Sequence, residues 1–413
     1  MQNIVLKNKT VLITGAAGFI GANLVLELLK TQSPIQIIGI DNLNEYYDVA
    51  IKKWRLLEID KCLDKHNKST WKFIKGSIAD RTLVDEIFCT YKPEIVVNLA
   101  AQAGVRYSIT NPDAYIESNL IGFYNILEAC RHSYDNGQTG VEHLVYASSS
   151  SVYGSNKKVP YSTDDKVDNP VSLYAATKKS NELMAHAYSK LYNIPSTGLR
   201  FFTVYGPAGR PDMAYFGFTN KLLKGENIQI FNYGNCMRDF TYVDDIVEGI
   251  KRVMQGAPEK RKGEDGLPIP PYAVYNIGNN HPENLLDFVD ILQQELVRAK
   301  VLPEEYDFEK HKELVAMQPG DVPEPFEMKR RAGMPEYRTQ VANTVNRVSE
   351  TSSYTPLPRG TITMAEQTVR EQRIYQTKDP FTKAEEQLFE GTLSDRKAAA
   401  SGASEKKPDA TTV

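Results

Sequence analysis

Long apolar segments are absent from this sequence. No apolar run in the 413 residues approaches the length of a transmembrane helix, and the start, MQNIVLKNKTVLITG, lacks an apolar stretch ended by a small-residue cleavage site. Charge of one sign is not in excess either, because the formal net charge is −3 at pH 7. We therefore expect a soluble protein that binds neither a nucleic acid nor a membrane.

Cysteine is scarce and widely spaced. The four cysteines, Cys62, Cys89, Cys130 and Cys236, form neither a metal-ligand pair nor a disulfide framework. This usage is typical of a reducing compartment, so we expect a cytoplasmic protein without a metal site. The rest of the composition, 41% hydrophobic and 24% charged, is that of an ordinary globular enzyme with one large domain and a lobe, or with two domains.

The first half of the chain alternates between short apolar runs and longer amphipathic stretches. The runs expected to be strands are 10–14, 35–41, 72–76, 95–99, 142–147 and 197–202. The stretches expected to be helices are 19–30, 49–62, 81–91, 113–131 and 173–192. Strands that are apolar on both faces and separated by helices predict a Rossmann-type α/β fold, a doubly wound parallel sheet covered on both sides.

The alternation weakens after Tyr205. Two turn-rich stretches, 206–239 and 256–282, are expected to form a smaller lobe, with a helix over 243–255 that returns to the sheet and another over 285–301. Residues 323–413 are rich in charges, Ser, Thr, Pro and Gln, so they bury too little apolar surface to offset their ordering entropy. We expect this tail to be largely disordered, with one short helix near 364–376.

Three glycines directly follow the first expected strand. Gly15, Gly18 and Gly21 form G-x-x-G-x-x-G at the start of a helix, where the backbone can approach a pyrophosphate and the helix N-terminus supplies amide donors. A chance loop could also contain such a trio, but its place between a strand and a helix favours a dinucleotide site. Asp41 ends the second strand, where a carboxylate accepts from ribose hydroxyls and repels a 2′-phosphate, which favours NAD over NADP. Its alternative role is a turn or cap aspartate.

Tyr174 and Lys178 lie four residues apart, so both project from one face of an expected helix. A nearby ammonium lowers a tyrosine pKa toward neutrality, which would make Tyr174 a general base. The serine run 148–151 ends a strand, and its hydroxyls can bind a substrate oxygen or can merely form a loop. The expected cofactor contacts, in addition to the glycines and Asp41, are Phe19, Ile20, Asn42, Ile78, Leu99, Ala100, Ala101, Tyr174 and Lys178.

These motifs together resemble a known family. The glycine trio, the Tyr174/Lys178 pair and the segments NLAAQAGVRYS, SSSSVYG, LRFFTVYGP and RDFTYVDD are similar to the extended short-chain dehydrogenases/reductases of the NAD-dependent epimerase/dehydratase family, which act on nucleotide sugars. DNLNEYYDV and GRPDMAYFGFT resemble the UDP-glucuronate 4-epimerases among them. The resemblance implies that 1–205, with 240–256, is the NAD-binding domain and that 206–322 is mainly a UDP-sugar lobe.

The resemblance also implies residue roles. Tyr174 would be the base, Lys178 its partner and a ribose ligand, and Ser149 the third catalytic hydroxyl. Thr203 stands where galactose epimerases carry Asn. The residues that could bind the substrate carboxylate are Thr203, Ser150, Ser151 and Arg210, with Arg106 as another candidate. Arg238 would bind the UDP phosphates, and Asp321 would lie near the ribose or uridine. Arg210 could instead be a solvent-facing turn residue.

The implied reaction is epimerisation at C4 of UDP-glucuronate through a 4-keto sugar, in a homodimer paired through the helices 113–131 and 173–192. Related dehydratases carry Asp-Glu, and uronate decarboxylases carry Glu, where this chain has Ser150 and Ser151. The alternatives are another UDP-sugar 4-epimerase, a uronate decarboxylase or, in a different class, a non-catalytic NAD-binding scaffold.

Two departures from the family pattern bear on these expectations. Ser77 replaces an Asp expected near adenine, which predicts weaker cofactor binding. The sequence after Val322 does not match the family's closing segment.

Overall fold

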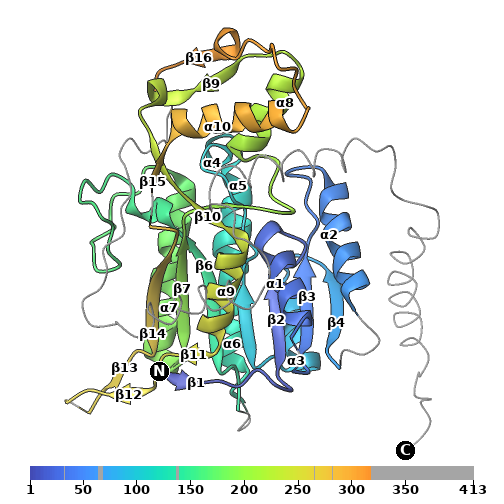
Figure 1. Cartoon of the computed structure of the whole chain (residues 1–413). Helices are drawn as coiled ribbons and strands as arrows, with labels where there is room; N and C mark the ends of the chain where they lie inside the picture. Colours follow the sequence, from blue (N-terminus) through green and yellow to red (C-terminus); the bar gives the residue numbers. More distant parts are fainter. Residues whose placement is uncertain (32, 64–67, 136–138, 265, 281, 318–413) are drawn as a thin grey trace, which may run out of the picture. The chain divides into compact units, whose positions relative to one another are not determined.

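The computed structural model describes residues 1–317 apart from 32, 64–67, 136–138, 265 and 281. Its main sheet has seven parallel strands in the order β14-β7-β6-β5-β2-β3-β4 (Figure 1). They are β2 (Thr10–Thr14), β3 (Gln36–Asp41), β4 (Thr70–Lys75), β5 (Ile95–Asn98), β6 (His143–Ser149), β7 (Ser196–Phe201) and β14 (Tyr272–Ile277). The doubly wound parallel sheet predicted from the sequence is therefore confirmed.

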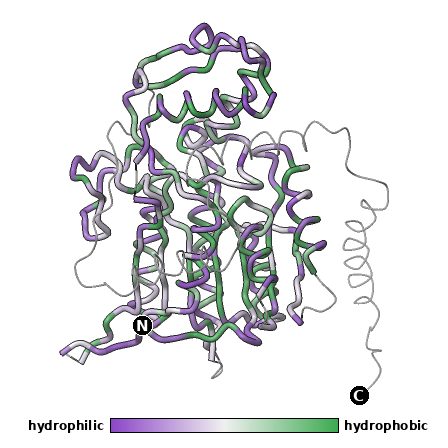
Figure 2. The backbone as a smooth tube through the Cα atoms, viewed as in Figure 1, coloured by the Kyte–Doolittle hydropathy of each residue, from purple (hydrophilic) through white to green (hydrophobic). Residues whose placement is uncertain are grey.

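Helices cover both faces of this sheet. One face carries α1 (Phe19–Leu29), α2 (Val49–Cys62) and α9 (Val243–Met254), and the other carries α3 (Arg81–Tyr91), α6 (Gly122–His132) and α7 (Leu173–Tyr192). Because the strands between them are covered twice, their residues are apolar without alternation, and Val11, Leu12 and Ile13 are all buried. Figure 2 shows this hydrophobic character along the central strands.

The helix expected over 113–131 is not continuous. After α4 (Tyr107–Thr110), the chain forms α5 (Pro112–Tyr115), a π-helical turn η1 (Ile116–Ile121) and then α6. The buried side chain of Asn119 in η1 accepts a hydrogen bond from the Gln102 amide (2.8 Å) and donates one to the Gln102 carbonyl (3.1 Å). Sequence periodicity missed the turn because its wider winding changes the helical pattern by only one residue.

The placement of 256–282 in the smaller lobe is wrong for its last strand. Tyr272–Ile277 is β14, which pairs in parallel with β7 at the edge of the main sheet. All six residues are half-buried, so they give neither a continuous apolar run nor an alternation. The rest of the stretch contains short strands, in which β11 (Gly256–Ala257) pairs with β1 (Gln2–Asn3), and β12 (Arg261–Lys262) with β13 (Pro268–Ile269).

The smaller lobe begins where the chain leaves β7. Its elements are β8 (Thr203–Tyr205), α8 (Ala214–Leu223), β9 (Ile228–Ile230), η4 (Phe231–Gly234), β10 (Met237–Tyr242), β15 (Pro282–Asn284), α10 (Leu285–Arg298), η5 (Glu309–His311) and β16 (Lys312–Leu314). The sheet β15-β10-β8 and the pair β16-β9 frame a core of its own that includes Phe216, Phe288 and Leu292. The stretch 206–239, expected to be turns, thus contains a helix whose apolar face packs into this core.

Two features concern the described residues only. No helix there combines the length and apolar character needed to cross a membrane. No group of three His, Cys, Asp or Glu side chains there is placed to hold a metal ion. The expected disordered tail, with its short helix, lies outside the described residues.

Candidate active site

A cavity of about 460 Å³ lies where the carboxyl ends of the main-sheet strands meet the lobe. In a doubly wound sheet, ligands bind at these ends beside the point where the strand order reverses, which is here between β2 and β5. Every expected cofactor contact lines the cavity: Gly15, Gly18, Phe19, Ile20, Gly21, Asp41, Asn42, Ile78, Leu99, Ala100, Ala101, Tyr174 and Lys178.

The glycine-rich turn fits a dinucleotide because its backbone packs tightly beside the cavity. At Gly15, whose φ is +69°, an added Cβ would lie 2.8 Å from the backbone nitrogen of Ala100. At Gly21 it would lie 2.1 Å from the carbonyl oxygen of Gly15. Gly18 is the N-cap of α1 and brings no side chain, so the first turn of the helix stays open to an anion.

Asp41 is buried at the end of β3. Its carboxylate oxygens accept hydrogen bonds from the backbone N–H of Ala17 (3.2 Å) and of Leu43 (2.9 Å), so it ties the glycine-rich turn to the next loop. Burial raises the pKa of the Asp41 carboxyl, while the positive charge of Lys52 acts in the opposite direction. The sequence analysis missed Lys52, which also lines the cavity. The sequence does place Lys52 on the apolar side of the helix expected over 49–62, and this unusual position could have indicated a functional lysine.

The catalytic candidates converge from two elements. Ser149 ends β6 and caps the 3-10 turn η3 (Ser150–Tyr153), since its Oγ accepts hydrogen bonds from the Ser151 amide (3.2 Å) and the Ser151 hydroxyl (2.9 Å). Tyr174 and Lys178 come from the first turns of α7, which Ser172 caps at the Ala175 amide. Ser149 and Tyr174 both line the cavity, and the Ser149 hydroxyl lies close enough to lower the pKa of Tyr174, so the strand end and the helix meet at one side of the cavity.

The pKa values of Tyr174 and Lys178 are shifted mainly by burial. Burial raises the pKa of the Tyr174 hydroxyl, and the hydrogen bond to Ser149 and the charge of Arg210 only partly oppose it. Burial lowers the pKa of Lys178 to about 8. The direction of the Tyr174 shift is opposite to the lowering expected from the Lys178 ammonium, because removal from water outweighs the neighbouring charges.

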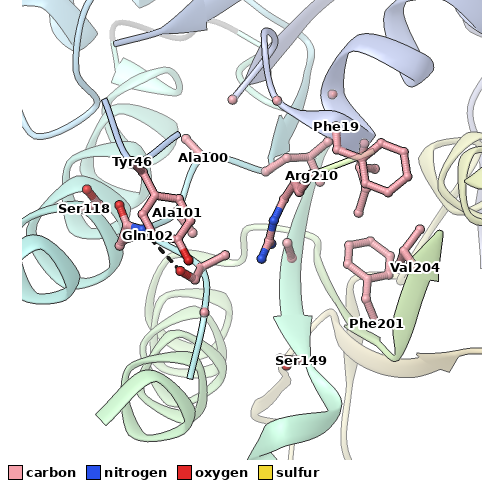
Figure 3. A pocket seen from close by; sticks show the side chains of 18 of the residues that line it. Phe19, Tyr46, Ala100, Ala101, Gln102, Ser118, Ser149, Phe201, Val204 and Arg210 are labelled. Carbon is pink, nitrogen blue, oxygen red and sulfur yellow. Dashed lines mark hydrogen bonds between the residues drawn. The ribbon is translucent and has the colours of Figure 1, made fainter. Parts of the chain in front are cut away.

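The expected carboxylate-binding residues mostly face the same cavity. Ser150, Ser151, Thr203 and Arg210 line it, and Figure 3 shows the Arg210 guanidinium extending into its middle. Arg210 already forms a bidentate pair with Asp212, at 3.0 Å from Nε to Oδ1 and 2.6 Å from Nη2 to Oδ2. A substrate carboxylate would therefore share this guanidinium with Asp212.

The other three residues expected to bind the substrate differ in their positions relative to the cavity. Arg238 of β10 lines the cavity on the lobe side. Arg106 is not among the cavity-lining residues, and its guanidinium packs 4.0 Å from the centre of the Phe231 ring. Asp321 lies outside the described residues.

Several lining residues were not singled out from the sequence, among them Tyr46, Gln102, Ser118 and Asp239. Asp239 is buried, and its two carboxylate oxygens accept from the amides of Asn279 and Asn280, both at 2.8 Å. It lies within RDFTYVDD, so the motif was noticed but not this residue. Ser118 faces the cavity from η1, which no periodicity predicted.

Comparison with known proteins agrees with this geometry. Residues 11–278 match the family model described as the NAD dependent epimerase/dehydratase family. The chain belongs to this family. It is 50% identical over 322 residues to Protein CapI of Staphylococcus aureus, a match that covers 76% of this chain and 89% of that protein.

Two further relatives have names that state an activity. A probable UDP-glucuronate 4-epimerase of Rhizobium meliloti is 39% identical over 76% of this chain and 87% of its own length. The crystal structure of UDP-glucuronic acid 4-epimerase from Bacillus cereus, in complex with UDP-glucuronic acid and NAD, is similar with a TM-score of 0.67. It is 26% identical, and the match covers 88% of this chain and 99% of that one.

Proposed function

We propose that this chain is an NAD-dependent 4-epimerase that interconverts UDP-glucuronate and UDP-galacturonate. The observation that carries the proposal is the meeting of Ser149 and Tyr174 in the cavity that the glycine-rich turn also lines, with Arg210 extending into it. Membership of an epimerase/dehydratase family and the names of the relatives support the same reaction.

In the proposed reaction, the Tyr174 oxygen takes the proton from the sugar 4-hydroxyl, and the Ser149 hydroxyl binds the oxygen that becomes the ketone. Bound NAD supplies a reversible hydride acceptor and a positively charged nicotinamide ring. The Ser149 hydroxyl and the charge of Arg210 favour the phenolate form of Tyr174 against the effect of burial, and a bound nicotinamide cation would act in the same direction. As Tyr174 takes the 4-hydroxyl proton, the C4 hydrogen would leave as hydride to the cofactor. After the 4-keto sugar has rotated in the site, Tyr174 would return the proton to the 4-oxygen and the hydride would return to the opposite face of C4.

The uronate carboxylate must survive the ketone stage. A 4-keto-6-carboxylate is a β-keto acid, so it loses carbon dioxide when the breaking bond aligns with the ketone π system. Arg210 binds the carboxylate with a charge-assisted bond, and Thr203, Ser150 and Ser151 bind it through their hydroxyls. These contacts hold the carboxylate near the plane of the ring and slow the loss.

A uronate decarboxylase on the same fold is the second candidate. The strand end offers serines at 150 and 151, with no carboxylate to act as a second acid or base there. This composition favours return of the hydride over loss of carbon dioxide.

The proposal includes a homodimer. Apolar side chains are exposed on η1 and α6, at Ile116, Ile121 and Tyr124, and on α7, at Leu183 and Leu191, which are 60% and 70% exposed. These elements also contact one another within the chain. The proposed partner of these exposed residues is the same set of residues on a second copy of the chain, because pairing of the helices would remove the apolar side chains of both copies from water.

The proposal also places the protein in the cytoplasm. All four cysteines are free thiols, and two of them, Cys130 and Cys236, are buried. Free buried thiols suit a reducing compartment.

The deciding experiment is incubation of the purified protein with UDP-glucuronate, with separation of the products by chromatography. UDP-galacturonate without added NAD is the expected product, since the oxidised cofactor is regenerated in each cycle. A UDP-pentose as the main product would make the protein a decarboxylase. Absence of any product, with UDP-galactose formed from UDP-glucose, would make it a 4-epimerase of neutral sugars.

A further inference from the structure

Arg55 is a buried arginine outside the catalytic group. It comes from α2, is 1% exposed, and is the largest of the fully buried side chains. A buried charge is costly unless its donors are all paired, so its partners show why the fold keeps it.

All five N–H donors of the Arg55 guanidinium are used. Nε and one N–H of Nη2 donate to the Ala208 carbonyl, at 3.0 and 2.7 Å, and the other N–H of Nη2 donates to the Gly209 carbonyl at 2.9 Å. Nη1 donates to the Ala17 carbonyl at 3.0 Å and to the Tyr47 hydroxyl at 2.7 Å. These partners are neutral oxygens, three of them backbone carbonyls.

The two ends of this arrangement belong to different sites. Ala17 lies in the glycine-rich turn, and its N–H donates to Asp41, the expected ribose ligand. Ala208 and Gly209 immediately precede Arg210, whose side chain enters the substrate side of the cavity. One guanidinium therefore joins the dinucleotide turn to the backbone that carries the arginine proposed for the uronate.

The loop 207–209 depends on such side chains for its conformation. Ala208 has φ of +59°, a left-handed conformation that costs free energy in a residue other than glycine and persists only where the surroundings hold it. The preceding Pro207 carbonyl accepts from Asn23 of α1 at 3.2 Å. Three successive carbonyls are thus held by side chains from α1 and α2, both of which belong to the nucleotide-binding half.

A second contact joins the same two halves. The Tyr46 hydroxyl, from the loop after Asp41, donates to Asp212 at 3.0 Å, and Asp212 is the bidentate partner of Arg210. Arg55 thus holds the backbone of the two residues that precede Arg210, and Asp212, which is itself held by Tyr46, binds the Arg210 side chain.

We propose that Arg55 is a positioning residue that couples the NAD site to the uronate site by setting the place of Arg210. The coupling rests on the proposed function for the identity of the uronate ligand. It predicts that Arg55 affects recognition of the sugar carboxylate and leaves recognition of the UDP part, for which Arg238 is the expected partner, unchanged. By thermodynamic reciprocity, UDP-glucuronate should then tighten the equilibrium binding of NAD, and this tightening should be reduced where Arg55 is replaced.

The test uses the NAD-loaded protein and calorimetric titration with UDP-glucuronate and with UDP. Arg55→Lys keeps the charge but offers three donors on one nitrogen in place of five on three nitrogens, so it cannot keep all five hydrogen bonds. We expect it to weaken UDP-glucuronate binding by about tenfold, while UDP binding stays within about twofold. Tyr47→Phe removes one partner of Arg55 and should act in the same direction with a smaller effect. Arg252→Lys, at an ion-paired arginine of α9 away from the cavity, is the matched control and should change neither.

A role confined to folding would give a different result. Equal weakening of both ligands by Arg55→Lys, or no weakening of either, would overturn the coupling. If Arg55→Lys does not yield folded protein, Tyr47→Phe decides on the same criterion. NAD content after prolonged dialysis, with and without UDP-glucuronate, should differ more in the wild type than in Arg55→Lys, and equal protection in both would also overturn it. Failure of the proposed function shows separately, as wild-type protein that forms no UDP-galacturonate from UDP-glucuronate.

Discussion

The Nζ atom of Lys178 donates a hydrogen bond to the carbonyl oxygen of Ala147, at 2.8 Å. The bond joins α7 to the end of β6, two residues before Ser149, so the lysine holds the strand end and the helix together where the catalytic hydroxyls meet. One carbonyl does not compensate an ammonium that is only 4% exposed, and burial lowers its pKa to about 8.

This burial predicts a pH dependence of stability in the NAD-free protein. Lys178 has a pKa of about 8 when folded and about 10.5 when unfolded, so between these values the unfolded chain binds more protons. Stability should therefore rise as the pH rises from 8 to 10.5, by roughly 3 kcal/mol if this group acts alone. Thermal melts of wild type and Lys178→Met across this range test it. The rise should be missing in the variant, and parallel curves would show that Lys178 is not its source.

Tyr174→Phe keeps the ring and removes the proton acceptor. Turnover of UDP-glucuronate should fall by roughly two to four orders of magnitude, with little change in substrate affinity. Tyr188→Phe is the matched control on the same helix, since its hydroxyl bonds Glu128 at 2.7 Å and does not line the cavity. Activity of Tyr174→Phe within a few-fold of wild type would remove this tyrosine from the mechanism.

The carboxylate site is tested by the partition between products. Thr203→Val removes a hydroxyl from the cavity, and Arg210→Ala removes the cation, so each should slow epimerisation and raise the fraction of UDP-pentose. Loss of one charged bond should also weaken substrate binding by roughly 1.5–3 kcal/mol. Chromatography of the products gives both rate and partition. Slower turnover with an unchanged partition would mean that these residues only bind substrate.

Ser77 offers a gain-of-affinity prediction for the cofactor. It lines the cavity after β4, and its Oγ accepts from the Ala79 amide at 3.1 Å. An aspartate can keep this bond with one oxygen and offer the other to the adenine amino group, so Ser77→Asp should tighten NAD binding by about threefold to tenfold. Ser77→Ala is the control and should not tighten it. Fluorescence titration of stripped protein measures the change, and equal affinity in wild type and Ser77→Asp would contradict the expected adenine contact.

The proposed dimer predicts sensitivity at an exposed leucine. Leu183→Glu on α7 places a charge in the proposed paired surface of each subunit. The protein should become monomeric in light scattering at micromolar concentration, with its melting temperature little changed if the monomer is stable. Leu267→Glu, at a similarly exposed leucine between β12 and β13, should leave the mass unchanged. An unaltered mass for Leu183→Glu would place the interface elsewhere.

The sequence by itself determined the fold class and most of the cofactor site. Apolar runs without polar alternation can be recognised in the sequence without tertiary information. Gly15, Gly18 and Gly21 are needed locally, by one tight turn. The pairing of Tyr174 with Lys178 likewise follows from helical spacing alone. Resemblance then supplied Thr203, Arg210 and Arg238, all three of which line the cavity.

Tertiary structure decided what depends on surroundings. The pKa of Tyr174 is raised because burial, which spacing cannot reveal, outweighs nearby charges. β14 was not predicted because this edge strand is half-buried throughout. Arg106 is not part of the cavity lining, and its guanidinium packs on the Phe231 ring. Arg55 is ordinary in the sequence. Ala17 and Ala208 are 191 positions apart in the sequence, and only folding brings both to the same guanidinium. Hydrogen-bond partners are selected by distance in space and not along the chain.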